Sequence, residues 1–400
     1  MINKIKAEFN VIYMVFTDSL KTIFTDPGAL LILMFAAIFY PVVYSIAYKK
    51  EVLTEIPVVV VDYDNTTMSR QWCKMIDATP QVHVSHKASD MLHAQEMFWQ
   101  GTVNAVLEVP KGFEKDIYKG TQASISMYAD GSNFLLYKET FKSTSTATGT
   151  LSAGIEMKRL MAKGNRQEQA MHQIQPIKTS VYNLYNPSGG YGSFVMPGIM
   201  LIIIQQTLLI GIGLVGGLGR ERKRDKTQTF GIDLKKHAAS VIMGKSLAYF
   251  IIGFFNIIFA TVLVYHWFSF PSKGMFSNVL ILAIPFLFSV IFMGMTVSLL
   301  FKHREHSIMF LVFLSPIILF VAGLSWPVSA MPPAIHNIFK IFPSTYMVPS
   351  YLRLRTMGVS LHDIKPELAA LTLQMVVYYV IAVLGFKIAM KKRVSNSLME

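Results

Sequence analysis

Side chains that could do chemistry are few and scattered in this chain of 400 residues. Asp62 and Asp64 flank a tyrosine at the end of an apolar run, where two carboxylates can hold a metal ion. An Asp-Asn pair after a strand is also an ordinary turn, which is the interpretation we favour. Cys73 is the single cysteine, which excludes an intrachain disulfide and predicts a small side chain packed in a core.

The remaining chemical motifs are incomplete. His83, His86 and His93 are close in sequence, but in a strand residues 83 and 86 point to opposite faces, which favours chance clustering over a metal site. Gly244-Lys245-Ser246 ends like a phosphate-binding loop, yet Ala239 stands where the upstream glycine is needed. No G-x-S-x-G, H-E-x-x-H or cysteine cluster occurs. We therefore expect no enzyme, no bound metal and no cofactor on this chain.

The elements that must position these residues are predominantly apolar. The sequence is 52% hydrophobic and only 15% charged, whereas soluble domains carry roughly 25% charged residues. A helix needs about 20 apolar residues to cross a bilayer. The charge-free stretches are Gly28–Tyr48, Thr179–Gly219, Ser246–Ser272, Gly274–Phe301, Ser307–Phe339 and Leu368–Phe386. They predict six membrane-spanning helices near residues 28–48, 194–217, 246–267, 278–300, 307–324 and 367–387.

The charges predict the orientation. The net charge of +13 is concentrated beside the apolar stretches, whereas residues 49–192 are close to neutral, with 15 Lys+Arg and 14 Asp+Glu. Basic residues gather in cytoplasmic loops, so the charge indicates topology and not a nucleic-acid partner. Six spans place both termini, the loop 219–245 and the basic tail 389–400 in the cytoplasm. The first span, with 27 residues before it, is too long for a signal-peptide core and predicts an uncleaved anchor.

The expected fold is an all-α six-helix transmembrane domain with an inserted external α/β domain between helices 1 and 2. Residues 1–27 predict an interfacial amphipathic helix with the apolar positions Ile5, Phe9, Ile12, Phe16, Leu20 and Ile23; packing on another protein is the alternative. Span 28–48 follows, and short strands alternate with helices in the external domain, 49–192. From Phe134 we expect a long helical excursion with a break at Ser143–Thr150. The five-helix block covers residues 193–388.

No Asp, Glu, Lys or Arg lies in the charge-free stretches that form the predicted spans, where Gln205 and Gln206 are the strongest polar residues. Coupling to an ion gradient needs such a group, so a proton-coupled pump is disfavoured. If ATP drives the protein, another chain must hydrolyse it. The predicted docking element is the basic stretch that follows the second span; a simple positive-inside anchor is the alternative. Its residues are Arg220, Glu221, Arg222, Lys223, Arg224, Asp225, Lys226 and Thr227.

The whole chain resembles the membrane subunits of type-2 ABC exporters, in the branch with a large external domain after the first helix. The resemblance rests on Pro57-Val-Val-Val-Val-Asp-Tyr-Asp-Asn65, Val109-Pro-Lys-Gly-Phe-Glu114, Tyr185-Asn-Pro187 and Met196-Pro-Gly198. Gly219-Arg-Glu221 is similar to the start of the family's coupling stretch, although Asp225-Lys226-Thr227 replaces its usual glycine.

The most specific match is residues 323–346, similar to the family's outer-side signature G-x-x-(F/W)-P-x-x-x-M-P with a short helix after it. Its site residues are Gly323, Trp326, Pro327, Met331, Pro332, Pro343 and Tyr346, and Arg353, Arg355 and Gly358 follow. Ile335, Ile338, Phe339 and Phe342 form an apolar stripe opposite His336, Asn337 and Lys340. We expect an outer re-entrant segment, 325–352, packed on protein or lining a cavity.

The resemblance implies a permease in the bacterial inner membrane, with its large domain periplasmic. Two permease subunits, as a homodimer or heterodimer, would pair around a pathway, and ABC ATPase subunits carrying ATP and Mg would dock below. A periplasmic adaptor and an outer-membrane channel are possible further partners. Implied cargoes are drugs and other amphiphiles, as in multidrug efflux. The alternative is a membrane-anchored sensor or assembly scaffold whose external domain is a binding module; a secreted-domain enzyme is third.

Overall fold

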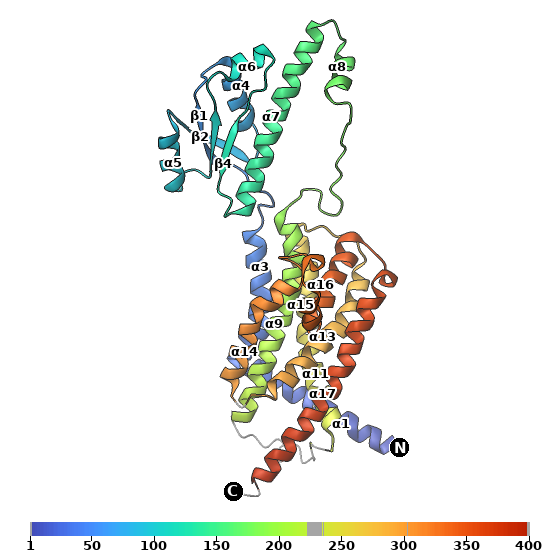
Figure 1. Cartoon of the computed structure of the whole chain (residues 1–400). Coiled ribbons are helices and arrows are strands. Elements are labelled where there is room, and N and C mark those ends of the chain that lie inside the picture. Colours follow the sequence, from blue (N-terminus) through green and yellow to red (C-terminus); the bar gives the residue numbers. More distant parts are fainter. Residues whose placement is uncertain (1, 222–233, 235, 302, 398–400) are drawn as a thin grey trace. The chain divides into compact units, whose positions relative to one another are not determined.

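The computed structural model of this chain describes residues 2–221, 234, 236–301 and 303–397. These residues belong to two compact units, one formed by residues 1–49 and 184–400 and the other by residues 50–183 (Figure 1). The first unit is helical. The second contains a small sheet with helices.

The helical unit contains six helices, among the described residues, that are long and apolar enough to cross a membrane. Their bounds are Pro27–Ala47, Tyr191–Gly217, Ala238–Phe268, Phe276–Ser298, Arg304–Val321 and Leu361–Lys391. The prediction of six spans is confirmed. The third begins at Ala238 and not near residue 246, because Lys245 is accommodated inside the helix with its Nζ 5.4 Å from the centre of the Phe386 ring.

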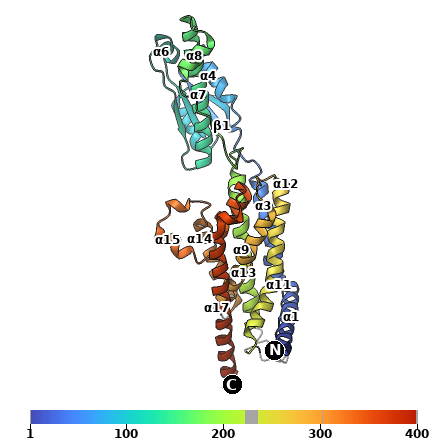
Figure 2. The same cartoon turned by 90° about the vertical axis from the view of Figure 1, so that its right-hand side faces the viewer.

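The elements of this unit follow the chain. They are α1 (Ile2–Thr25), α2 (Pro27–Leu30), α3 (Ala37–Ala47), α9 (Tyr191–Glu221), α11 (Ala238–Ile258), α12 (Tyr265–Phe268), α13 (Phe276–Ser298), α14 (Arg304–Val321), α15 (Pro333–Phe339), α16 (Ser344–Leu352) and α17 (Lys365–Ser397). π-helical turns join several of them, at Leu31–Ala36, Phe259–Val264 and Arg353–Met357, and short 3₁₀ turns lie at Val328–Ala330 and Leu361–Ile364. Figure 2 shows α15 beside α14, at one side of the helical unit.

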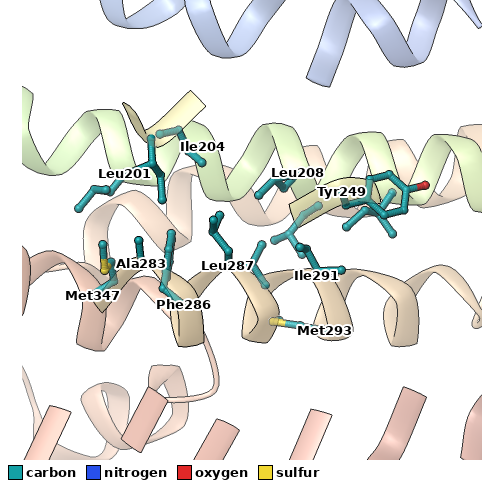
Figure 3. Close-up of a cluster of buried hydrophobic side chains, with 14 of the residues drawn as sticks. Leu201, Ile204, Leu208, Tyr249, Ala283, Phe286, Leu287, Ile291, Met293 and Met347 are labelled. Carbon is teal, nitrogen blue, oxygen red and sulfur yellow. The ribbon is translucent and has the colours of Figure 1, made fainter. Parts of the chain in front are cut away.

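The core of the helical unit lies where α9, α11 and α13 meet. Figure 3 shows Leu201, Leu208, Tyr249, Phe286 and Leu287 from these helices directed toward one another. All five are less than 5% exposed. Close packing of apolar side chains is what holds helices together once lipid surrounds them, because the bilayer supplies no hydrophobic driving force.

The second unit contains a four-stranded sheet in the order β2-β1-β3-β4. The strands are β1 (Ile56–Asp62), β2 (Val82–Ala88), β3 (Ala105–Val109) and β4 (Ser126–Ala129); β1 is parallel to β2 and β3, and β4 is antiparallel to β3. The helices are α4 (Thr67–Asp77), α5 (Met91–Trp99), α6 (Phe113–Lys119), α7 (Phe134–Ala162) and α8 (Gln167–Ile174). Val58 and Val60 pack with residues of α4, α6 and α7, and Val59 and Val61 pack with Ala94 of α5.

Helix α7 corrects one expectation. It runs without a break through Ser143–Thr150, where we predicted one. Thr146 and Thr150 donate to the carbonyls four residues earlier, both at 2.7 Å, so their hydroxyls are satisfied inside the helix. Thr148 accepts a hydrogen bond from the Trp72 indole at 3.0 Å, which fixes this stretch against α4.

Helix α1 has a different buried face from the one predicted. Val11, Val15 and Ile23 are at most 3% exposed, whereas Ile5 and Phe9 are 61% and 69% exposed. The buried positions pack against α11. The predicted apolar stripe is therefore divided, with one part in the protein core and the other part on the surface, where an interfacial helix would meet lipid.

Candidate functional site

The chain between α14 and α16 forms a proline-rich segment (residues 323–343) with its own internal contacts. Gly323, which follows α14, has φ +84°, and a Cβ there would lie 2.8 Å from Val328 Cγ2. Glycine is favoured at such a position because L-residues with side chains avoid this backbone region. The Trp326 indole donates to the Ala330 carbonyl at 3.3 Å and closes the loop around Pro327.

Prolines mark the ends of the short helix in this segment. Pro332 precedes α15, and Pro333 is its first residue, where a fixed φ and a missing amide suit a helix start. The Met331 side chain just before them is buried. Pro343 precedes α16, and its carbonyl accepts from the amide of Tyr346 at 3.2 Å.

Side chains of α17 cap the end of α15. The last carbonyls of a helix have no partner inside it and need one elsewhere. Gln374 Nε2 donates to the carbonyl of Lys340 at 2.6 Å and lies 3.3 Å from that of Ile341. The Tyr378 hydroxyl also donates to the Ile341 carbonyl. The proline-rich segment is thus fixed to the last span.

A glutamine of α9 holds the start of α16. Gln205 Nε2 donates to Ser344 Oγ at 3.0 Å, and Gln205 Oε1 accepts from the Ser344 amide at 2.9 Å. Gln205 is fully buried and Ser344 is 1% exposed. Two hydrogen bonds in an apolar setting fix this contact more firmly than either does alone.

The segments 196–198 and 323–324, both part of the resemblance, meet in space. A Cβ on Gly198 would lie 2.3 Å from Leu324 Cδ2, so the glycine lets α9 approach the end of α14. Sequence reasoning singled out both segments without predicting that they touch. A contact between positions so far apart along the chain has no signal in one sequence.

Two arginines after α16 fix the other end of the region. Arg353 pairs with Glu367 at 2.9 Å and donates to the carbonyl of Asp363 at 2.6 Å. Arg355 Nη2 donates to the Thr261 carbonyl at 3.2 Å, which lies in a π-helical turn. The Arg355 guanidinium also stacks on the Tyr265 ring, 5.1 Å from its centre.

This region can brace and position helices, but it has no apparatus for covalent chemistry. Most of its polar contacts join a side chain to a backbone carbonyl or amide and hold the backbone in place. The apolar stripe predicted for residues 335–342 does not lie on a single buried face. Phe342 is buried, whereas Ile335 and Ile338 are exposed. Those two side chains leave an apolar face on α15 for lipid or another chain.

The comparison with known families decides the identity. A profile described as ABC-2 family transporter protein matches residues 28–384. The chain belongs to this family. No curated protein matches the chain.

In this ABC-2 family permease, the predicted coupling stretch lies mostly outside the described residues. Arg220 and Glu221 end α9. The other predicted coupling residues are Arg222, Lys223, Arg224, Asp225, Lys226 and Thr227, and all of them lie outside the described part of the chain. Their role as a coupling element stays a prediction.

The residues at the start of α11 contact the N-terminal helix α1. His237, which precedes α11, lies with Nδ1 3.0 Å from Glu8 Oε1 of α1. The Ser240 hydroxyl donates to the same carboxylate. A Cβ on Gly244 would lie 2.6 Å from the Ile12 carbonyl, so α1 packs directly on the backbone of α11. No pattern in the amino-acid sequence predicted this cluster.

In the sheet unit, the acidic pair has a structural role. Asp62 accepts from the amides of Asp64 and Asn65 at 3.1 and 3.0 Å, as the predicted turn requires. Asp64 accepts from the amides of Gly112 and Glu114 at 2.8 and 2.9 Å. The loops after β1 and β3 are therefore held together by one carboxylate.

Hydrogen bonding stabilises the charged form of Asp64. Partial burial alone raises the pKa of this carboxyl. The hydrogen bonds from the Glu114 amide, the Thr66 hydroxyl and the Gly112 amide outweigh that effect and lower the pKa below its ordinary value. The charge thus persists to lower pH in the folded unit than in the unfolded chain.

The other candidate groups of the sheet unit are also structural. His83 lies 3.2 Å from Asp77 Oδ1 at the surface, and no group of metal ligands occurs in the parts of the chain that the structure describes. Cys73 is buried in α4, as predicted. Burial, with the nearby charge of Asp62, raises the pKa of its thiol to about 11.

Proposed function

We propose that this chain is the membrane-spanning permease subunit of an ATP-driven exporter, which moves drugs or other amphiphiles out of the bacterial cytoplasm. Membership of the ABC-2 family supports a transport subunit that works with an ABC ATPase. A separate ATPase chain binds ATP and Mg and supplies the energy. Two permease subunits, as a homodimer or heterodimer, form the pathway.

The observation that carries this proposal is the absence of charge from the middle of every span. In the six apolar helices, each Asp, Glu, Lys or Arg lies within eight residues of an end, as at Lys245, Glu367 and Lys387. A pump driven by an ion gradient needs an ionisable group deeper in the membrane. Energy must therefore enter from outside the membrane, through another chain.

The orientation follows from the charges. The stretch from Gly219 through Lys245 holds eight basic and three acidic residues, which favours the cytoplasmic side. With six spans, both termini lie in the cytoplasm. The sheet unit, between the first and second spans, is then periplasmic and the protein lies in the inner membrane. A periplasmic adaptor and an outer-membrane channel are further proposed partners.

The coupling loop gives the direct test. The chain is expressed with its partner ATPase, and dye efflux and ATP hydrolysis are measured with Glu221→Ala and with residues 222–226 deleted. We expect unchanged membrane insertion and at least a tenfold loss of efflux. The matched control is Lys387→Ala with Lys391→Ala, which removes basic charge at another helix end. Efflux that survives the deletion, or falls equally in the control, contradicts the coupling role.

A further inference from the structure

Arg355 and Lys273 are two cations at one end of the helical unit, in segments that lie in direct contact. The Lys273 amide donates to the Arg355 carbonyl at 2.9 Å, and a Cβ on Gly358 would lie 3.3 Å from Lys273 Cβ. Lys273 lies between the third and fourth spans, and Arg355 lies shortly before the sixth. Residues at the ends of spans lie near the level of the lipid headgroups, so both cations belong to that level.

Neither cation forms a salt bridge with a carboxylate in the described part of the chain. The carboxylates that follow in the sequence are engaged elsewhere. Glu367 pairs with Arg353 at 2.9 Å, and Asp363 accepts from the Ser360 hydroxyl at 2.7 Å. The segments 269–275 and 353–367 together hold four basic and two acidic residues. The described residues therefore leave the charge of Arg355 and Lys273 without a counter-ion.

Aromatic rings hold both cations in place. The Arg355 guanidinium lies 5.1 Å from the centre of the Tyr265 ring and 5.8 Å from that of Phe276, and Lys273 Nζ lies 5.1 Å from that of Tyr185. A ring face stabilises a cation without neutralising its charge. Arg355 Nε is buried without a hydrogen-bond partner, which is costly for a charged donor. The guanidinium is thus positioned and still lacks an acceptor.

Three irregular backbone features meet at these cations. Arg355 lies in the π-helical turn Arg353–Met357, and its Nη2 donates at 3.2 Å to the Thr261 carbonyl in the π-helical turn Phe259–Val264. Tyr185, against Lys273, has φ +66°, which is strained for a bulky side chain. π-helical turns and strained residues concentrate at functional sites, where they position side chains for a ligand.

Exposed apolar side chains flank the two cations. Met275 follows Lys273 by two residues and is 73% exposed, and Met357 follows Arg355 by two residues and is 43% exposed. A free anion in water gains nothing from such neighbours. An anionic group that carries hydrocarbon chains matches both the cations and the apolar surface beside them.

We propose that Arg355 and Lys273 bind the phosphate group of a phospholipid at this end of the spans. The planar guanidinium donates to two phosphate oxygens, and Lys273 contributes a second positive charge. The phosphate neutralises the pair, and one of its oxygens is the acceptor that Arg355 Nε lacks. Binding joins the loop 269–275 to the turn 353–357. The inference needs only a chain that spans a membrane and does not rest on the proposed transport function.

The first test compares two lipids that differ only in the phosphate. The purified full chain is stripped of lipid in detergent and mixed with phosphatidic acid or with diacylglycerol of the same acyl chains; native mass spectrometry counts the bound lipid. Phosphatidic acid should bind and raise the unfolding temperature by about 2 °C or more, whereas diacylglycerol should do neither. Equal binding of both lipids overturns the site. Displacement of the lipid by millimolar inorganic phosphate assigns the site to free phosphate and overturns the phospholipid.

The second test removes each cation. Arg355→Gln should weaken the binding of phosphatidic acid about tenfold or more, and Lys273→Gln about threefold or more, whereas Lys273→Arg should retain it. Lys365→Gln is the matched control, because it removes a charge from an exposed position at the start of the sixth span. Lys273 is exposed, so its variants keep the test decisive if Arg355→Gln does not fold. Unchanged affinity in Lys273→Gln, or an equal loss in Lys365→Gln, contradicts the site.

Discussion

At the residue scale, Asp64 and Gln205 show how buried and half-buried polar side chains of the described chain hold its backbone in place. Asp64 joins the loops after β1 and β3 through the amides of Gly112 and Glu114, and Gln205 exchanges two hydrogen bonds with Ser344. Such groups stabilise a single arrangement because any other arrangement leaves a buried donor or acceptor unpaired. None of these contacts positions a reacting atom.

Asp64 makes the sheet unit sensitive to acid. Its pKa is lowered in the folded unit, so its contribution to stability is complete above the unfolded value of 3.8 and is lost as the pH falls through the lowered folded value. Asp64→Ala should destabilise the unit by about 1–3 kcal/mol at pH 7, since two amides lose their acceptor. Thermal unfolding of the full chain at pH 7 and pH 3 measures both effects. An equal penalty at the two pH values contradicts this role.

Cys73 should be nearly inert. Burial raises the pKa of its thiol to about 11, so almost no thiolate is present at pH 7. We expect maleimide labelling of the native protein to be at least a hundredfold slower than labelling in denaturant. Ser132→Cys in a Cys73→Ser background is the control, because residue 132 is exposed. Rapid labelling of native Cys73 shows that α4 opens readily.

At the element scale, the proline-rich segment is stable only because α9 and α17 support it. Gln374 and Tyr378 cap the carbonyl end of α15, and Gln205 holds the start of α16. A seven-residue helix is too short to be stable alone. Its place in the fold therefore depends on these three side chains more than on its own sequence.

Removal of one cap should loosen α15. Tyr378→Phe deletes the hydroxyl that donates to the Ile341 carbonyl and should destabilise the segment by about 1 kcal/mol. Hydrogen exchange of the amides in residues 336–342 should become several-fold faster. The control is Tyr379→Phe, whose hydroxyl donates to Ala239, outside the segment. Equal exchange in wild type and Tyr378→Phe argues against the cap.

The contact between α9 and the end of α14 can be tested by a double-mutant cycle. Gly198→Ala places a Cβ 2.3 Å from Leu324 Cδ2 and should destabilise the protein by about 1–3 kcal/mol. Leu324→Ala removes the obstructing atoms, so the double variant should lose less than the sum of the single variants. Additive losses, measured by thermal unfolding, are evidence that the two residues do not touch.

Much of this architecture could be predicted because it depends on local pattern. Six charge-free stretches predicted six apolar helices, which the described part of the chain contains, and the strands and helices predicted to alternate in the external domain occur in the sheet unit. The start of the third helix was wrong because Lys245 is accommodated by a ring 141 positions away, at Phe386. The predicted break in α7 was wrong because Thr146 and Thr150 bond within the helix.

The candidate site was predictable only in part. The prolines, Trp326 and Gly323 mark a segment that cannot continue a straight helix. Its supports Gln374, Tyr378 and Gln205 come from distant parts of the chain, where an uncharged polar residue in an apolar helix carries no information about its partner.

At the scale of the whole molecule, the chain belongs to a transporter family, and we propose that another chain supplies its energy. The family profile covers residues 28–384, and the middle of each span lacks charge. In the sheet unit, Asp64 holds the backbone of a neighbouring loop and Cys73 is buried. These features together favour a permease that depends on another chain.

The most direct test of this account is ATP-dependent export in reconstituted liposomes. The chain alone, its partner ATPase alone and the two together are compared for ATP hydrolysis and for movement of a fluorescent amphiphile. We predict that export requires both chains with ATP and Mg, and that the permease alone neither hydrolyses ATP nor exports. ATP hydrolysis by the purified chain alone, or export that continues without the ATPase, contradicts the central claim.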